Sequence, residues 1–161
     1  MILIIIGLCL QSCGIYSFTG TSLSPDVKTI SVEYFQNMAP LVAPSLSSSF
    51  TDALKDQFIR YTKLQQVRSE GDLQFSGEIR GYDVAPSAIT GDEVASKNRL
   101  SIRVHVKFVN MKDELQNFEK DFSAYEEFPG EQSLDAVQGQ LIEKIVKTLV
   151  ENIFNASVAN W

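Results

Sequence analysis

Hydrophobic and polar residues alternate along four segments of the chain, and the clearest alternation covers residues 99–109. Successive side chains of a β-strand point to opposite faces of the sheet, so a period of two predicts a strand with one buried face. Shorter alternating segments predict three further strands at residues 29–35, 72–82 and 117–125. In residues 99–109 the face expected to be buried consists of five apolar residues: Leu100, Ile102, Val104, Val106 and Phe108.

Two other segments repeat apolar residues at spacings of three and four, which predicts amphipathic helices over residues 45–61 and 134–156. Ser133 is suited to the N-cap of the second helix. This helix carries two adjacent apolar stripes, which indicates burial against a sheet or against a sheet and a neighbouring helix. Three residues of its central stripe are expected to be buried: Leu141, Ile145 and Leu149.

The order strand, helix, three strands, helix predicts an α+β fold, a two-layer domain in which both helices pack on one face of a mixed four-stranded sheet. The first strand–helix–strand unit favours a parallel pair, and the last three strands favour antiparallel hairpins. Residues 86–97 are polar and aperiodic, so we expect a long loop there. One face of the sheet is left without helices.

The N-terminus carries an apolar run, residues 2–10, that ends just before Ser12 and Cys13. Nine helical residues rise about 14 Å, too short for a hydrocarbon core of roughly 30 Å. The pattern resembles a bacterial lipobox, which implies that residues 1–12 are a lipoprotein signal peptide and that Cys13 receives a diacylglycerol. A buried N-terminal strand is the alternative. Residues 13–28 are then a tether, and residues 29–161 a single domain.

The chain is acidic, with a formal net charge of -6 at pH 7. This balance argues against nucleic-acid binding, which depends on clustered Lys and Arg. Cys9 and Cys13 are the two cysteines of the sequence, and both belong to the N-terminal segment. The domain therefore has no thiol for a disulfide, a metal site or nucleophilic catalysis, and we expect neither a metal nor another cofactor.

The solvent face predicted for residues 99–109 is basic. It carries four residues that are candidates for binding phosphate or an anionic lipid: Arg99, Arg103, His105 and Lys107. In the alternative interpretation the row is paired with acidic residues of the returning strand, with Lys107 opposite Glu119 or Asp121. The two interpretations are compatible.

Tyr82 and Tyr125 are expected on the same open face. Exposed aromatic residues beside Arg are typical of protein contact surfaces, and ordinary packing at the sheet edge is the alternative. His105 is the only histidine, and the charges of Arg103 and Lys107 are expected to disfavour its protonation. No nucleophile elbow, phosphate-binding loop or metal-ligand motif is present, so we expect no enzymatic activity.

The residues after Cys13 spell Gly14-Ile15-Tyr16-Ser17-Phe18-Thr19-Gly20. Together with the order of strands and helices, this segment resembles the LPS-assembly lipoprotein family LptE, in its Bacteroidetes-like form. The resemblance implies a lipid-anchored protein on the periplasmic face of the outer membrane. It also implies that the protein plugs an LptD-like β-barrel, helps this barrel to assemble and assists lipopolysaccharide transport to the cell surface.

A second resemblance gives an alternative function. Residues 30–37 and the helix after them are similar to the opening of curli-assembly and penicillin-binding-protein-activator lipoproteins. Such proteins bind or regulate other envelope proteins. The partner that co-purifies from membranes, a large β-barrel or a synthase, would distinguish the two classes.

Overall fold

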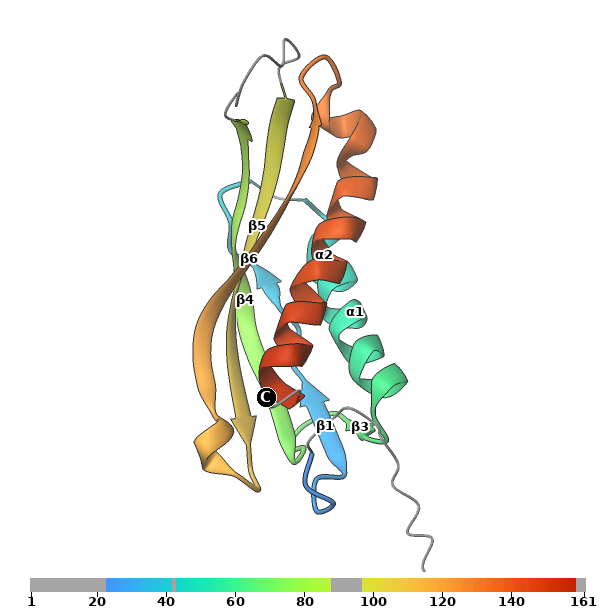
Figure 1. The fold of residues 1–161 in the computed structure, drawn as a ribbon, viewed down its shortest axis with the longest axis vertical. Coiled ribbons are helices and arrows are strands. Elements are labelled where there is room, and N and C mark those ends of the chain that lie inside the picture. Colours follow the sequence, from blue (N-terminus) through green and yellow to red (C-terminus); the bar gives the residue numbers. More distant parts are fainter. Residues whose placement is uncertain (1–22, 42, 88–96, 159–161) are drawn as a thin grey trace, which may run out of the picture.

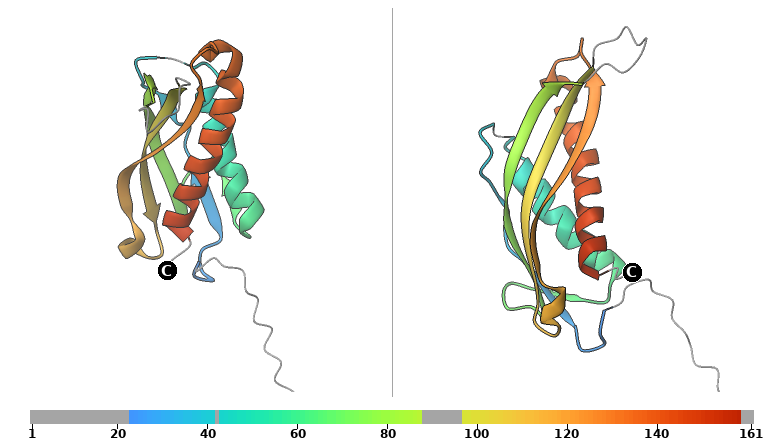
Figure 2. Two further views of the ribbon diagram at one scale, coloured as in Figure 1. Left: turned by 45° about the horizontal axis from the view of Figure 1, so that its top comes forward. Right: turned by 60° about the vertical axis from the view of Figure 1, so that its left-hand side comes forward.

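A computed structural model of the protein describes residues 23–41, 43–87 and 97–158. The predicted signal peptide, Cys13 and the first part of the predicted tether lie outside the described residues. Two helices form one layer and a twisted sheet forms the other (Figures 1 and 2). Both helices lie on the same face of the sheet, which confirms the predicted two-layer α+β fold.

The sheet is mixed, as predicted, but it has six strands instead of four. The strands are β1 (Thr29–Val32), β2 (Gln36–Asn37), β3 (Gln65–Val67), β4 (Leu73–Pro86), β5 (Lys97–Asn110) and β6 (Phe118–Pro129). Their order is β3-β1-β4-β5-β6, and β2 also pairs with β4. β1 runs parallel to β3 and β4, whereas β4, β5 and β6 are antiparallel. β2 and β3 were not predicted because two or three mostly polar residues are too short to show an alternation.

The helices are α1 (Leu46–Tyr61) and α2 (Leu134–Val158). The predicted burial in α2 is confirmed, since Ile145 and Leu149 are fully buried and Leu141 is 5% exposed. Val104 of β5, on the predicted apolar face, is also fully buried. The apolar periodicity of the sequence therefore identified the face of each helix that packs on the sheet.

A chain of phenylalanine rings connects the two layers. The ring of Phe58 in α1 lies 4.9 Å from Phe75 in β4 and 5.0 Å from Phe154 in α2, measured between ring centroids. Phe75 continues to Phe108 of β5 at 4.8 Å, and Phe108 to Phe118 of β6 at 5.1 Å. Tilted ring pairs at such distances each contribute about 0.5–1.5 kcal/mol beyond the burial of their area.

The predicted position of Tyr82 on the open face is wrong. Ile79 of β4 lies opposite Val104, but Gly81 lies opposite Arg103, so Arg80 is an extra residue in the strand. Because side chains alternate with a period of two, one inserted residue exchanges the faces of all residues after it. Tyr82 consequently points toward the helices, where it is 2% exposed, and this burial raises the pKa of its hydroxyl.

Asp72, directly before β4, fixes the beginning of β1. Its Oδ2 accepts hydrogen bonds from the backbone N–H of Lys28 (2.9 Å) and Thr29 (3.0 Å) and from the Thr29 hydroxyl (2.9 Å). Its Oδ1 lies 3.1 Å from Nζ of Lys112. The hydrogen bond from the Lys28 N–H and the contact with Lys112 hold the pKa of Asp72 far below its ordinary value.

A carboxylate with a lowered pKa stabilises the fold above its unfolded pKa, and this contribution is lost as the pH falls toward the folded pKa. We expect Asp72→Asn to lower the free energy of unfolding at pH 7 by about 1.5–3 kcal/mol, the range for a hydrogen bond to a charged group. The variant should also lose less stability than the wild type between neutral pH and pH 3. Urea unfolding at several pH values measures both effects.

Asp52→Asn is the control for this prediction, because Asp52 is exposed and contacts only Lys55, at 3.8 Å, among the ion pairs of the described residues. A wild-type stability and pH dependence for Asp72→Asn would show that the Asp72 hydrogen bonds do not hold β1.

Candidate functional site on the open face of the sheet

The sheet face opposite the helices is uncovered, and the long strands β4, β5 and β6 form most of it (Figure 2, right). The structure places Arg103, His105 and Lys107 of the predicted basic row on this face, at alternating positions of β5. Arg103 and Lys107 are exposed, whereas His105 is half-buried. Arg99 lies on the same face near the start of β5.

His105 is held between two carboxylates of β6. Its Nδ1 lies 2.7 Å from Oδ1 of Asp121, and its Nε2 lies 3.0 Å from Oε1 of Glu119. Arg80, the extra residue of β4, approaches the same Asp121 oxygen at 3.7 Å and binds Glu78 at 2.8 Å. The open face therefore carries a network of opposite charges at its centre, and the pairing alternative for the basic row is correct for His105.

The expectation that its neighbours disfavour protonation of His105 is wrong. Hydrogen bonds to Asp121 and Glu119 raise the pKa of His105, and the His105 contact in turn lowers the pKa of Asp121. Asp121 lies directly opposite His105, and residues in opposite positions are closer than residues two apart on one strand. Glu119 lies diagonally from His105 and reaches its second ring nitrogen at 3.0 Å, so the two hydrogen-bonded carboxylates outweigh Arg103 and Lys107. The sequence showed these carboxylates, but only the strand register shows that they meet His105.

Lys107 lies opposite Glu119 in the register of β5 and β6, which is one of its two predicted positions. Glu119 nevertheless binds His105. Within the part of the chain that the structure describes, Lys107 and Arg103 form no ion pair. Both cations are exposed to solvent, and Arg103 helps to lower the pKa of Asp121.

A second group surrounds Tyr125 of β6, which is 54% exposed, as predicted. The guanidinium carbon of Arg99 lies 4.0 Å from the centre of the Tyr125 ring. The same guanidinium binds Glu127 at 3.0 Å, and Ser87 and Arg99 together lower the pKa of the Glu127 carboxyl. Stacking of Arg on Tyr gives a flat, exposed surface of the kind found in protein contacts.

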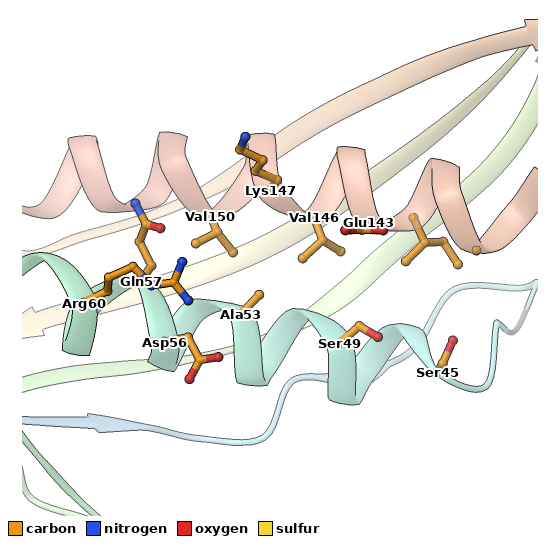
Figure 3. A pocket seen from close by; sticks show the side chains of 12 residues that line it. Ser45, Ser49, Ala53, Asp56, Gln57, Arg60, Glu143, Val146, Lys147 and Val150 are labelled. Atoms are coloured by element: carbon orange, nitrogen blue, oxygen red, sulfur yellow. The ribbon is translucent and has the colours of Figure 1, made fainter.

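Away from the open face, the described residues also form two surface pockets. One, of about 510 Å³, lies between α1 and α2 (Figure 3). Val146 and Val150 of α2 point toward Ala53 and Ser49 of α1, and charged side chains stand at its rim. The described residues contain no cluster of three or more His, Cys, Asp or Glu side chains that could hold a metal ion. Among the described helices none is long and apolar enough to cross a membrane.

Comparison with family models gives a match over nearly the whole described domain. Residues 27–157 match the model of LptE, a family described as lipopolysaccharide-assembly. The chain belongs to the LptE family. This confirms the resemblance found in the sequence and supports a role of the chain in lipopolysaccharide assembly; LptE is a family of non-enzymatic lipoproteins. The matched residues contain the whole open face, but not Cys13.

Solved structures share the LptE-like fold at low sequence identity. A minor lipoprotein from Acinetobacter baumannii is 13% identical, with a TM-score of 0.50 over 79% of this chain and 89% of that one. A hypothetical protein from Chlamydia trachomatis is 11% identical, with a TM-score of 0.52 over 83% and 99% of the two chains. A search of curated proteins gave no significant match. At such identities the likeness concerns the fold alone, and it assigns no role to a residue.

Proposed function

We propose that this LptE-family protein is anchored through Cys13 to the periplasmic face of the outer membrane and plugs an LptD-like β-barrel. In this role it helps the barrel to assemble and assists lipopolysaccharide transport, without catalysis and without a cofactor other than its lipid. The observation that carries the proposal is the uncovered, charged face of the sheet in a domain that matches the LptE family over residues 27–157.

The charge pattern of this face suits the inside of a barrel. The lumen of an outer-membrane barrel is polar, so a charged sheet can enter it without the cost of leaving water for an apolar surface. His105, Arg80 and their carboxylates are already paired within the domain. The paired charges therefore need no new partner in the lumen.

Arg103 and Lys107 give the same face a contact site for the phosphate groups of lipopolysaccharide. Both are exposed and without an ion pair among the described residues. Phosphate groups bind Arg and Lys through charge-assisted hydrogen bonds, which are roughly twice as strong as neutral ones. A local pair of cations is sufficient for such a contact even though the chain is acidic overall. Tyr82 is excluded from the contact surface because it is buried.

Crosslinking in cells tests the plug. Photo-crosslinkers at Arg103, Lys107 and Tyr125 should capture an outer-membrane barrel, whereas one at the buried Val104 should capture no protein. Capture only from positions in the connection between β4 and β5 would indicate that the plug enters the barrel in the opposite orientation. Capture of a synthase, or of copies of this chain, in place of a barrel would favour the curli-assembly or activator class of lipoprotein.

The anchor is tested separately. We expect the mature protein to begin at Cys13 and to carry a lipid there, which mass spectrometry of the N-terminus detects. Each buried CH₂ of an acyl chain contributes about 0.8 kcal/mol to membrane binding, so Cys13→Ala should move the protein from the membrane to the soluble fraction. Cys9→Ala is the control, since Cys9 lies within the predicted signal peptide. A chain that keeps Met1 or carries no lipid would refute the anchor.

A further inference from the structure

The second surface pocket, of about 750 Å³, lies where residues 23–28 meet the end of α1 and the beginning of β3. Figure 1 shows β1, β3 and the C-terminal end of α1 together at one end of the domain. Val27 and Leu64 give the pocket an apolar floor, and they are 7% and 8% exposed. The pocket is thus an open, amphipathic hollow away from the open face of the sheet, and Arg60 lines both this pocket and the groove between the helices.

The rim of this pocket is basic. Lys28, Arg60 and Lys63 line it, all three are exposed, and no lining residue among those described carries a carboxylate. Arg60 lies in the last turn of α1, where a cation also stabilises the helix dipole. Lys28 belongs to a different segment, so the helix end does not account for the whole cluster. A cluster of three cations is a local exception in a chain with a net charge of -6.

Tyr61 adds a second feature of the pocket. Its ring is 56% exposed, although one side lies 6.1 Å from the ring of Phe154, measured between centroids. An aromatic ring with a polar hydroxyl is favoured at the boundary between water and lipid, where one end is apolar and the other is wet. The lining therefore combines an apolar floor, an interfacial aromatic ring and a basic rim.

The position of the pocket relates it to the proposed anchor. Leu23, which lines the pocket, follows Cys13 by ten residues, and ten extended residues span at most about 35 Å. Only this closeness to the membrane depends on the proposed lipid at Cys13; the charge and the lining of the pocket do not. A domain held by that lipid keeps the pocket within reach of the membrane surface.

We propose that this pocket docks the domain on anionic phospholipids of the leaflet that holds the anchor. Lys28, Arg60 and Lys63 bind the phosphate groups, and Tyr61 and the apolar floor contact the glycerol and the upper part of the acyl chains. Because the chain as a whole is acidic, an anionic surface attracts this end of the domain more than the rest. Docking therefore fixes the orientation in which the domain meets its barrel.

The test measures binding of the full chain carrying Cys13→Ala, so that no covalent lipid contributes. The partition coefficient of this protein is measured on vesicles of phosphatidylcholine alone and on vesicles that also contain phosphatidylglycerol. The second value divided by the first gives a ratio that reports the electrostatic part of binding. Each basic residue near an anionic surface strengthens binding roughly fivefold. The triple variant Lys28→Gln, Arg60→Gln, Lys63→Gln should thus lower this ratio on the order of 100-fold.

The matched control removes three exposed cations elsewhere: Lys120→Gln, Lys144→Gln and Lys147→Gln. It has the same net charge as the first variant and should keep the wild-type ratio. The proposal would be overturned if the protein with Cys13→Ala alone had a ratio of one. An unchanged ratio in the first variant, or an equal decrease of the ratio in the control variant, would also overturn it. The proposal would also be overturned if the first variant lost binding to neutral vesicles that contain lipopolysaccharide but still bound vesicles with phosphatidylglycerol. The pocket would then be a lipopolysaccharide site. None of these results depends on crosslinking to a barrel or on acylation of Cys13.

Discussion

Replacing Gly77 with alanine is expected to lower the free energy of unfolding by about 2–6 kcal/mol, combining backbone strain and overpacking. Gly77 lies in β4 with a φ of +152°, a conformation that other residues rarely adopt. A Cβ at this position would lie 2.0 Å from the carbonyl oxygen of His105 and 2.8 Å from a ring carbon of Phe35. Neither neighbour can move easily, because the first is backbone of a central strand and the second is fully buried.

The same substitution in α2 provides a control of opposite sign. A Cβ at Gly139 would meet no atom within 4 Å, and alanine stabilises a helix interior relative to glycine by roughly 0.5–1 kcal/mol. Gly139→Ala should therefore raise the midpoint of urea unfolding while Gly77→Ala lowers it. A Gly77→Ala protein as stable as the wild type would show that β4 and β5 separate at Gly77 without cost, and that the close approach described above is not a constraint.

The second large effect is expected in α2. Ile145→Ala should cost about 2–5 kcal/mol, the usual range for truncating a fully buried aliphatic side chain, against a typical domain stability of about 5–15 kcal/mol. Ile145 is fully buried, in the helix that packs on both α1 and the sheet. Its loss therefore leaves a cavity where helices and sheet meet.

Lys144→Ala is the matched control, because Lys144 precedes Ile145 but is exposed. Urea unfolding of both variants separates the cost of the cavity from any change in helix propensity, which is small between Lys and Ala. Equal stability of the two variants would mean that α2 is not part of the core. Membrane release through Cys13→Ala should be unaffected by either substitution, since it depends on the lipid.

The open face shows where reasoning from the sequence was sufficient and where it failed. The alternation in residues 99–109 placed Arg103, His105 and Lys107 on one face, and the structure confirms this. Tyr82 was misplaced because the alternation of β4 was continued through Arg80, where the strand has an extra residue. An extra residue leaves no sign in hydrophobicity when its neighbours are Ile79 and Gly81, since glycine is compatible with either face.

His105 shows a limit of a different kind. Its neighbours along β5 are basic, whereas its partners across the strands are Asp121 and Glu119. Sixteen positions separate His105 from Asp121, and a one-residue change in the turn between β5 and β6 would have brought other side chains opposite the ring. The pairing, and with it the direction of the pKa shift, depends on register.

The sequence by itself determined the fold class, the two helices, the four longer strands and the buried stripe of α2, and it indicated the family. These features follow from periodicity, which is set by the 3.6 residues of a helical turn and the two-residue repeat of a strand. Only the tertiary structure decided the strand register, the extra residue in β4, the two short strands and the basic pocket beside Leu23. Each of these brings together residues that are distant in sequence, and no local pattern records which distant residues meet.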